Sequence, residues 1–315
     1  MISATAPAGL EELAVLRRIH RLLWSIRVGR CGPLARRAAL ALRLAAPVRG
    51  IGPLTNIVLG APSPASACEA SATIEGVVFE LDLRQSLHRA VYLNLFSLDL
   101  RRVVLPLLRP EDLVVDVGAN FGFWALPAAG RGCRVIAVEP VAETRARLAA
   151  NAARNGLTDR VEIVAAALSD SERPLQISVP GGESGQASAH PGGGGEVTTF
   201  DVAATTLDAL LGDRSARFLK IDVEGHEPAV LRGGARVLAS GQIEYVLIEL
   251  AGAVMARSGG SAATLIDLLA GHGYGFVRFV RANEGLFPRR SYGRLTLEQL
   301  RAGAHAGDAL WARRR

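Results

Sequence analysis

The part of the chain after Asp112 alternates apolar runs with helix-like stretches, and this alternation constrains the fold more than any other feature. Six runs are apolar at successive positions: DLVVDVG, CRVIAVE, RVEIVAAAL, FLKIDVEG, IEYVLIEL and YGFVRFV. Such runs are typical of strands buried on both faces, and helices between consecutive strands favour parallel pairing. We therefore predict an α/β fold with a mostly parallel sheet and helices on both faces.

Local composition suggests the remaining segments. Residues 180–195 contain too many glycines for regular structure, so we expect a flexible loop there, with a mobile substrate lid as the alternative. Residues 61–67, rich in proline, serine and alanine, resemble a linker. One helix is expected between the run DLVVDVG and about residue 130, and others over residues 141–154, 228–238 and 262–270.

Charge divides the chain into two parts. Residues 1–50 contain nine arginines and two glutamates, a net charge of +7, whereas the whole chain carries +6. We interpret residues 1–70 as a basic helical extension or cap and residues 71–315 as the main domain, with its core over residues 110–285. The basic helix could instead bind a membrane surface or a protein partner.

The composition argues against several classes of function. The main domain lacks an excess of basic residues, so no nucleic-acid partner is expected. The three cysteines are widely spaced and form no disulfide or zinc-binding pattern, which fits a cytoplasmic protein. No run of 18 apolar residues occurs, so no transmembrane helix is predicted.

The first apolar run ends in an acid and a glycine loop, DVGANFG. In an open α/β sheet, ligands bind beyond the carboxyl ends of the strands, and Gly118 and Gly122 let the backbone approach one closely. Asn120 stands where the dinucleotide fingerprint GxGxxG has its second glycine, so NAD or FAD fits poorly. Asp116 completes a candidate loop for a cofactor without a pyrophosphate.

The next two strands also end in groups suited to a nucleoside. Glu139 lies 23 residues after Asp116, at the end of the neighbouring strand, where a carboxylate can accept both hydroxyls of a ribose. The third strand ends near Ala166, Ser169 and Asp170. An acid–glycine loop, a ribose-binding acid and a small-residue segment suit adenosine with a short zwitterionic tail. S-adenosylmethionine has that shape.

Taken in order, VVDVGANFGFWAL, AVEP, NAARNGLTDRVEIVAAALSD, TTLDALL and LKIDVEGHEPAVLRGG resemble the FkbM family of S-adenosylmethionine-dependent methyltransferases. The resemblance covers roughly residues 80–250. It implies a Rossmann-like class I methyltransferase sheet and methylation mostly of oxygen, often on natural products or glycans. It also implies a set of cofactor-binding residues: Asp116, Gly118, Asn120, Gly122 and Glu139 around the cofactor, with Ala166, Ser169 and Asp170 flanking its adenine.

One position departs from the family pattern. Similar proteins often have a Tyr-Glu pair before the first strand, with the glutamate near the cofactor. Here the matching residues are Phe96 and Ser97, so that carboxylate is missing, and Asp99 is the candidate substitute. The first 70 and last 60 residues carry no such resemblance.

The segment RFLKIDVEGHEPAVLRGG contains Lys220, the only lysine of the chain. Alternate residues of a strand share a face, so Lys220, Asp222 and Glu224 are expected to point toward the cofactor together. His226 could accept the proton of an acceptor hydroxyl, and Lys220 could do so if burial lowered its pKa. The alternatives are an ion pair between Lys220 and either acid, and a capping or positioning role for His226. These four residues are the candidate catalytic set.

A divalent cation is a further hypothesis for the same region. Asp222, Glu224, His226 and Glu249 could supply ligands to an ion that lowers the pKa of a substrate hydroxyl. No spacing such as HExxH supports this, so no metal is assigned.

The main prediction is a methyltransferase that uses S-adenosylmethionine to methylate a hydroxyl of a small molecule, natural product or glycan. A nicotinamide-dependent oxidoreductase is the alternative that rests on the sheet alone, and Asn120 counts against it. A catalytically inactive, methyltransferase-like binding module is the other alternative, which the departure at Ser97 favours.

Overall fold

The computed structural model describes residues 69–92, 103–181, 183–190, 196–250, 260–280, 297–301 and 307–314. The predicted N-terminal extension up to residue 68, the linker at residues 61–67 and the position of Ser97 lie outside these ranges. The chain divides into two compact units, one of residues 1–70, 81–96 and 283–288 and one of residues 71–80, 97–282 and 289–315. The described part of the first unit includes α4 (Ser86–Tyr92). The central sheet belongs to the second unit.

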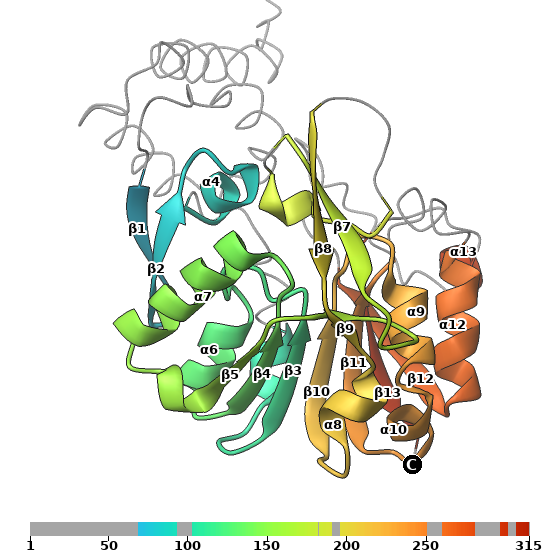
Figure 1. Ribbon diagram of the computed structural model, residues 1–315. Coiled ribbons are helices and arrows are strands. Elements are labelled where there is room, and N and C mark those ends of the chain that lie inside the picture. Colours follow the sequence, from blue (N-terminus) through green and yellow to red (C-terminus); the bar gives the residue numbers. More distant parts are fainter. Residues whose placement is uncertain are drawn as a thin grey trace, which may run out of the picture. The chain divides into compact units, whose positions relative to one another are not determined.

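Within the described residues, seven strands form the central sheet of a Rossmann-like α/β fold (Figure 1). In spatial order they are β12 (Tyr274–Val280), β13 (Asp308–Arg313), β11 (Ile243–Glu249), β10 (Ala216–Ile221), β3 (Leu113–Val117), β4 (Arg134–Val138) and β5 (Val161–Val164). β5, β4, β3, β10 and β11 pair in parallel, whereas β13 runs antiparallel between β11 and β12. The chain order reverses between β3 and β10, where sheets of this kind bind ligands.

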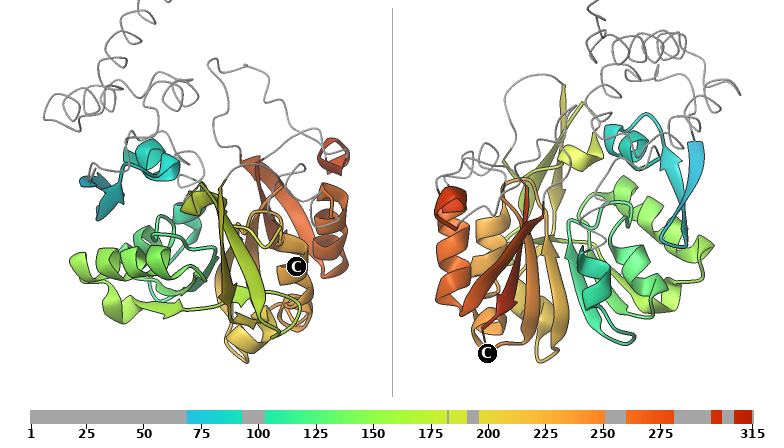
Figure 2. Two further views of the ribbon diagram at one scale, coloured as in Figure 1. Left: turned by 45° about the horizontal axis from the view of Figure 1, so that its top comes forward. Right: turned by 180° about the vertical axis from the view of Figure 1, so that it is seen from behind.

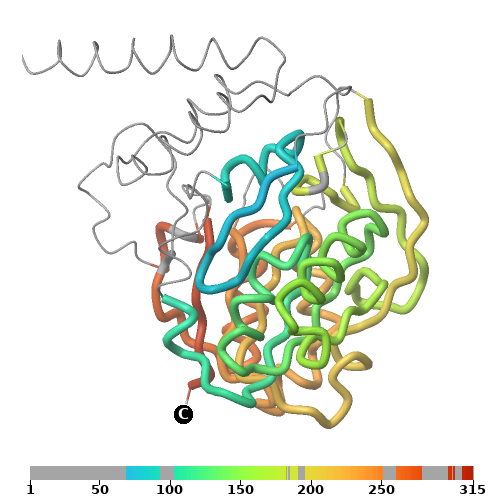
Figure 3. Tube along the Cα trace, turned by 90° about the vertical axis from the view of Figure 1, so that its left-hand side faces the viewer, coloured from blue at the N-terminus to red at the C-terminus, as the bar shows by residue number. Residues whose placement is uncertain are grey.

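Helices cover the sheet and bury its strands. β3 and β4 are each buried at four successive positions, which confirms the prediction from their apolar runs. α6 (Ala125–Gly130) and α7 (Ala142–Arg154) lie against β3, β4 and β5, and Figure 3 shows them side by side. One large apolar core joins strands β3, β4, β10 and β11 to α8 (Leu207–Leu211), α9 (Glu227–Arg232), α10 (Ala235–Ala239) and α12 (Ala262–Gly271). The removal of these apolar faces from water stabilises the layers.

Shorter elements surround this core. β1 (Glu69–Ile74) and β2 (Val77–Asp82) form a two-stranded sheet, and Asn151 and Asn155 of α7 accept hydrogen bonds from the backbone of β2. The remaining short helices are η1 (Leu105–Leu107), η2 (Thr158–Arg160) and α13 (Leu297–Arg301). Among the described helices, none has the length and apolar character needed to cross a membrane.

The segment after β5 differs from the sequence prediction. β5 ends at Val164, and β6 (Ala167–Leu168) pairs with β9 (Ala204–Thr205) in a separate small sheet. Two strands that the sequence did not predict, β7 (Leu175–Pro180) and β8 (Val197–Val202), flank the expected loop at residues 180–195 and pair as an antiparallel hairpin, and the loop between them contains η3 (Ser184–Gln186). Figure 2 shows this hairpin outside the central sheet. Residues 191–195 lie outside the described ranges.

The single helix expected over residues 228–238 is also wrong, because α9 and α10 are separated at Gly233 and Gly234. A Cβ atom on Gly233 would lie 1.9 Å from the carbonyl oxygen of Ser169, and one on Gly234 would lie 2.6 Å from the Leu207 side chain. Two neighbouring segments therefore approach the backbone so closely that only glycine fits. The turn between α9 and α10 leaves room for them.

Candidate functional site

The glycine loop after β3 adopts backbone conformations that bring it against the end of β10. Gly118 and Asn120 have φ angles of 75° and 50°, in the left-handed region that glycine and asparagine tolerate best. A Cβ atom on Gly118 would lie only 2.0 Å from the carbonyl oxygen of Asp222. Glycine at this position therefore allows the loop to contact the segment that holds the candidate catalytic residues. Gly122, with a φ of 94°, turns the chain toward α6.

Glu139 ties the glycine loop to the end of β4. Its Oε2 accepts a hydrogen bond from the backbone N–H of Asn120, and its Oε1 accepts one from Val141, each at 2.9 Å. Burial raises the pKa of Glu139 to about 7, although both backbone donors act in the opposite direction. The carboxyl group thus changes its charge near neutral pH. The predicted cofactor residues Gly118, Asn120 and Glu139 lie together at adjacent strand ends.

Lys220 is buried in an ion pair that joins β10 to β3. Its Nζ lies 3.1 Å from Asp116 Oδ1 and 3.5 Å from Asp222 Oδ2, and it donates to the carbonyl oxygen of Gly118 at 3.2 Å. Burial alone would lower the pKa of Lys220, but the charges of Asp116 and Asp222 outweigh burial and raise it. Lys220 is therefore protonated at neutral pH and has no lone pair to accept a proton. This geometry matches the ion-pair alternative.

Three carboxylates gather beyond the end of β10. One oxygen each of Asp222, Glu224 and Glu249 lies within 4.8 Å of the others, and all three residues are partly buried. Burial, followed by the charges of Asp222 and Glu224, raises the pKa of Glu249 to about 10, so Glu249 holds a proton at neutral pH. Burial and the Asp222 charge raise the pKa of Asp308 to about 7. Within the described chain His226 is not part of this cluster, so the four-residue metal set considered from the sequence does not form.

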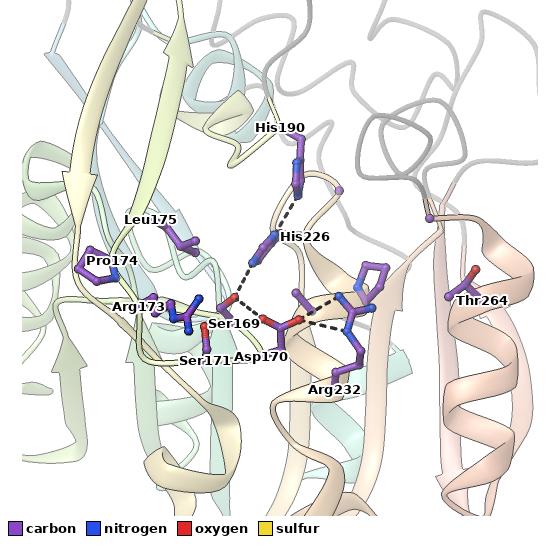
Figure 4. A pocket seen from close by; sticks show the side chains of 14 residues that line it. Ser169, Asp170, Ser171, Arg173, Pro174, Leu175, His190, His226, Arg232 and Thr264 are labelled. Atoms are coloured by element: carbon purple, nitrogen blue, oxygen red, sulfur yellow. Dashed lines mark hydrogen bonds and ion pairs between the residues drawn. The ribbon is translucent and has the colours of Figure 1, made fainter.

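His226 instead contacts Ser169 and His190. Its Nε2 lies 3.0 Å from Ser169 Oγ, and its Nδ1 lies 3.0 Å from His190 Nε2 (Figure 4). Burial, followed by the neighbouring His190, lowers the pKa of His226 to about 4, so the ring is neutral at pH 7. Its side chain makes no capping hydrogen bond to α9, which excludes the capping alternative.

A cavity of about 410 Å³ lies beside this pair of histidines. Its lining comprises Ser169, Asp170, Ser171, Arg173, Pro174, Leu175, His190, Gly225, His226, Pro228, Ala229, Arg232, Gly260 and Thr264. Ser169 and Asp170, predicted to flank the adenine, thus share a cavity with His226, while Ala166 is buried just before β6. The turn from Asp222 to His226 connects this cavity to the glycine loop.

Several residues of this region escaped the sequence analysis. Ser188 Oγ donates to the carbonyl oxygen of Glu224 at 2.6 Å, and this contact holds the strand hairpin near His226. His190 follows Ser188 closely and lies in a glycine-rich stretch, so its sequence context gives no functional signal. Arg232 forms an ion pair with Asp170 at 3.1 Å across 62 positions of the chain. Only the folded chain brings these groups together.

Comparison with known proteins identifies the family. Residues 116–276, just over half of the chain, match the Methyltransferase FkbM domain. The chain belongs to the FkbM methyltransferase family. The matched range of this FkbM domain begins at Asp116 of the glycine loop and contains Glu139, Ser169, Lys220 and His226.

Individual relatives of this FkbM chain are distant. AMB antimetabolite synthetase AmbE of Pseudomonas aeruginosa is 29% identical over 212 residues, which cover 55% of this chain and 10% of that protein. The chain thus spans about a tenth of the length of the curated relative that it matches. The solved structure of methyltransferase FkbM from Methylobacillus flagellatus KT has 15% identity and a TM-score of 0.41, covering 71% of this chain and 54% of that chain.

A second solved structure is that of magnesium protoporphyrin IX methyltransferase from Synechocystis PCC 6803 with bound SAM. It is 12% identical to the chain described here, with a TM-score of 0.43. The alignment covers 72% of this chain and 84% of that chain.

Proposed function

We propose that this chain transfers a methyl group from S-adenosylmethionine to a hydroxyl oxygen of a small molecule, natural product or glycan. The observation that carries the proposal is the meeting of the glycine loop, Glu139 and the Asp222 turn at adjacent strand ends. This is the place where open α/β sheets bind nucleoside cofactors. Membership of the FkbM methyltransferase family supports the same reaction class.

The residues of this edge fit the cofactor in two respects. Glu139 uses one lone pair of each oxygen for a backbone N–H, so each oxygen can still accept a ribose hydroxyl. Asp116 Oδ2 is buried without a hydrogen-bond partner among the described residues, which leaves an acceptor for a donor from a bound ligand.

The chain's own residues then have separable roles. When bound, S-adenosylmethionine supplies a sulfonium-activated methyl group, which needs positioning more than electrophilic assistance. Lys220 fixes Asp116 and Asp222 at the ends of β3 and β10. A neutral imidazole ring, such as those of the two histidines near the turn from Asp222 to His226, is suited to accept the hydroxyl proton. A hydroxyl becomes a good nucleophile only when its proton is removed.

The choice of a small-molecule acceptor has support from two sides. The matched relative is named an antimetabolite synthetase, which suggests a metabolite as the substrate of a similar domain. The main domain also lacks the excess of positive charge that a nucleic-acid substrate would favour, because the positive net charge is concentrated in residues 1–50.

Calorimetry with the whole chain tests the cofactor assignment. S-adenosylmethionine and S-adenosylhomocysteine are titrated separately, with NADH as the control ligand. We expect both nucleosides to bind and NADH not to bind, because Asn120 occupies the position of a fingerprint glycine. Absence of binding of either nucleoside at millimolar concentration would refute the proposal. A screen of hydroxyl compounds with labelled S-adenosylmethionine, read as a mass gain of one methyl group, then tests the acceptor class.

A further inference from the structure

Four polar side chains form a hydrogen-bonded row along the cavity beside His226. Asp170 Oδ1 lies 3.4 Å from Ser169 Oγ, Ser169 Oγ lies 3.0 Å from His226 Nε2, and His226 Nδ1 lies 3.0 Å from His190 Nε2 (Figure 4). All four line the same cavity. They come from the segment after β6, the turn after β10 and the hairpin, so three separate parts of the chain meet here.

Asp170 determines which group donates and which accepts in each hydrogen bond of this row. Arg232 donates to Asp170 Oδ2 through both Nε and Nη2, so Asp170 is a carboxylate that accepts hydrogen bonds only. Ser169 therefore donates its proton to Asp170 and accepts from His226 Nε2–H. His226 Nδ1 is then bare and accepts from His190 Nε2–H.

This direction leaves a lone pair on His190 Nδ1. Within the described residues no hydrogen-bond partner of that nitrogen is present, and His190 lines the cavity. Burial lowers the pKa of His190, and the neighbouring His226 is neutral as well, so the lone pair is available at neutral pH. Among the described residues that line the cavity, the other charged side chains are those of Arg173, Asp170 and Arg232, and the last two neutralise each other.

We propose that this cavity receives the hydroxyl-bearing part of the acceptor and that His190 Nδ1 accepts the hydroxyl proton. Asp170, Ser169 and His226 are positioning residues that hold His190 in the tautomer able to do so, and this role replaces the adenine contacts that the family resemblance implies for Ser169 and Asp170. The O–H bond breaks with its electron pair left on the oxygen, and that oxygen forms the new bond to the methyl group. The electron pair of the broken S–CH₃ bond stays on sulfur, and the proton ends on His190. This inference rests on the proposed methyl transfer.

Nitrogen-15 NMR of the whole chain with labelled histidine tests the direction of the row without any acceptor. The chain has six histidines, so the His190→Gln and His226→Asn variants assign the two resonances. At pH 7.5 we expect both rings to be neutral, with the proton on Nε2 and a bare Nδ1. A proton on Nδ1 of His190 in the wild-type chain would overturn the proposal.

The Asp170→Asn variant provides the sharpest comparison. The Arg232 guanidinium has only hydrogen-bond donors, so it will continue to bind an oxygen, which is now the amide oxygen of the asparagine. The new NH₂ group will therefore face Ser169. Ser169 must then donate to His226, which reverses the row and moves the His190 proton to Nδ1. Ser171→Ala, a change in the same cavity outside the row, is the matched control and should leave both tautomers unchanged. Identical tautomers in the Asp170→Asn variant and the wild type would contradict the assigned direction.

Kinetics with an acceptor from the screen then test the proton transfer itself. His190→Gln should lower kcat by about 10²- to 10⁴-fold, as expected for loss of a general base, and change S-adenosylmethionine affinity less than twofold. Ser169→Ala should lower kcat by a smaller factor and alter its pH profile. Normal kcat in His190→Gln would refute this inference while leaving the methyltransferase assignment intact. Failure of the wild-type chain to bind S-adenosylmethionine would refute the methyltransferase assignment instead.

Discussion

The contacts of Lys220 give a physical reason for the one lysine of this arginine-rich chain to lie at the end of β10. Its ammonium group contacts acceptor oxygens of three residues: Asp116 Oδ1, Asp222 Oδ2 and the carbonyl oxygen of Gly118. A compact cation with three donors suits this arrangement, whereas a planar guanidinium needs more room and a different donor geometry. The lysine thereby fixes the two strand ends between which the cofactor site is proposed.

Replacement of Lys220 by alanine should destabilise the protein strongly. The change leaves Asp116 buried without its cation, and loss of one partner of a buried ion pair costs about 3–5 kcal/mol. Urea denaturation followed by circular dichroism measures the effect. Arg134→Ala, which removes an exposed pair with Glu111, is the control and should cost at most about 1 kcal/mol. Equal losses in the two variants would contradict a structural role for Lys220.

Glu139 should make cofactor binding depend on pH. Its pKa is raised to about 7 by burial, and hydroxyl donors from a ribose would favour the charged form and lower that pKa. Binding near pH 7 should therefore release protons, and affinity should increase between pH 6 and pH 8. Calorimetry in buffers with different ionisation enthalpies measures the number of protons released.

Glu139→Gln tests this assignment. The amide cannot ionise and offers one acceptor oxygen, so affinity should fall by about tenfold to a hundredfold and the proton release should disappear. Glu143→Gln, an exposed change in the first turn of α7, should leave both quantities unchanged. Proton release that persists in Glu139→Gln would assign the titration to another group.

At the scale of elements, the break between α9 and α10 is a point where separate parts of the chain interlock. Gly233 touches the backbone of Ser169, and Asp208 of α8 accepts hydrogen bonds from the backbone N–H groups of Arg236 and Val237 at the start of α10. The same break therefore positions Ser169 beside His226 and satisfies the first turn of α10 from outside the helix.

Gly233→Ala should separate these parts. Its Cβ atom would lie 1.9 Å from the Ser169 carbonyl oxygen, so the backbone of one segment must move. We expect a loss of about 1–3 kcal/mol in the free energy of unfolding and an altered His226 resonance in nitrogen-15 NMR. Gly271→Ala, at the end of α12 with no atom within 4 Å of the new Cβ, should be neutral or stabilise by up to about 1 kcal/mol. An unchanged His226 resonance in Gly233→Ala would argue against coupling through Ser169.

The sequence predicted elements that are marked by an uninterrupted run of apolar residues or by a polar residue at the end of such a run. The apolar runs identified β3, β4, β10, β11 and β12, and the strand-end rule placed Glu139 near Asn120. The hairpin of β7 and β8 was missed because β8 is exposed over most of its length, so no apolar run marks it. His190 was missed because its partner lies 36 positions away. Long-range contacts of this kind leave no local pattern.

At the scale of the whole molecule, the C-terminal strand lies inside the sheet, not at its edge. β13 pairs antiparallel with β11 on one side and β12 on the other, and it sets Asp308 opposite Glu249. Trp311 of β13 is 1% exposed and packs edge-on against Phe276 of β12. Residues 308–313 are therefore needed to join β11 and β12 into one sheet.

Removal of residues 308–315 should abolish cooperative folding. The truncation exposes the edges of β11 and β12 together and removes Trp311 from the main apolar core. Thermal unfolding followed by circular dichroism should lose its sharp transition, whereas removal of Arg315 alone should preserve it. Trp311→Ala removes the side chain but keeps the strand. The free energy of unfolding should then fall by about 3–5 kcal/mol, with the transition still cooperative. A truncated chain that unfolds at the wild-type temperature would mean that β11 and β12 can close the sheet without β13.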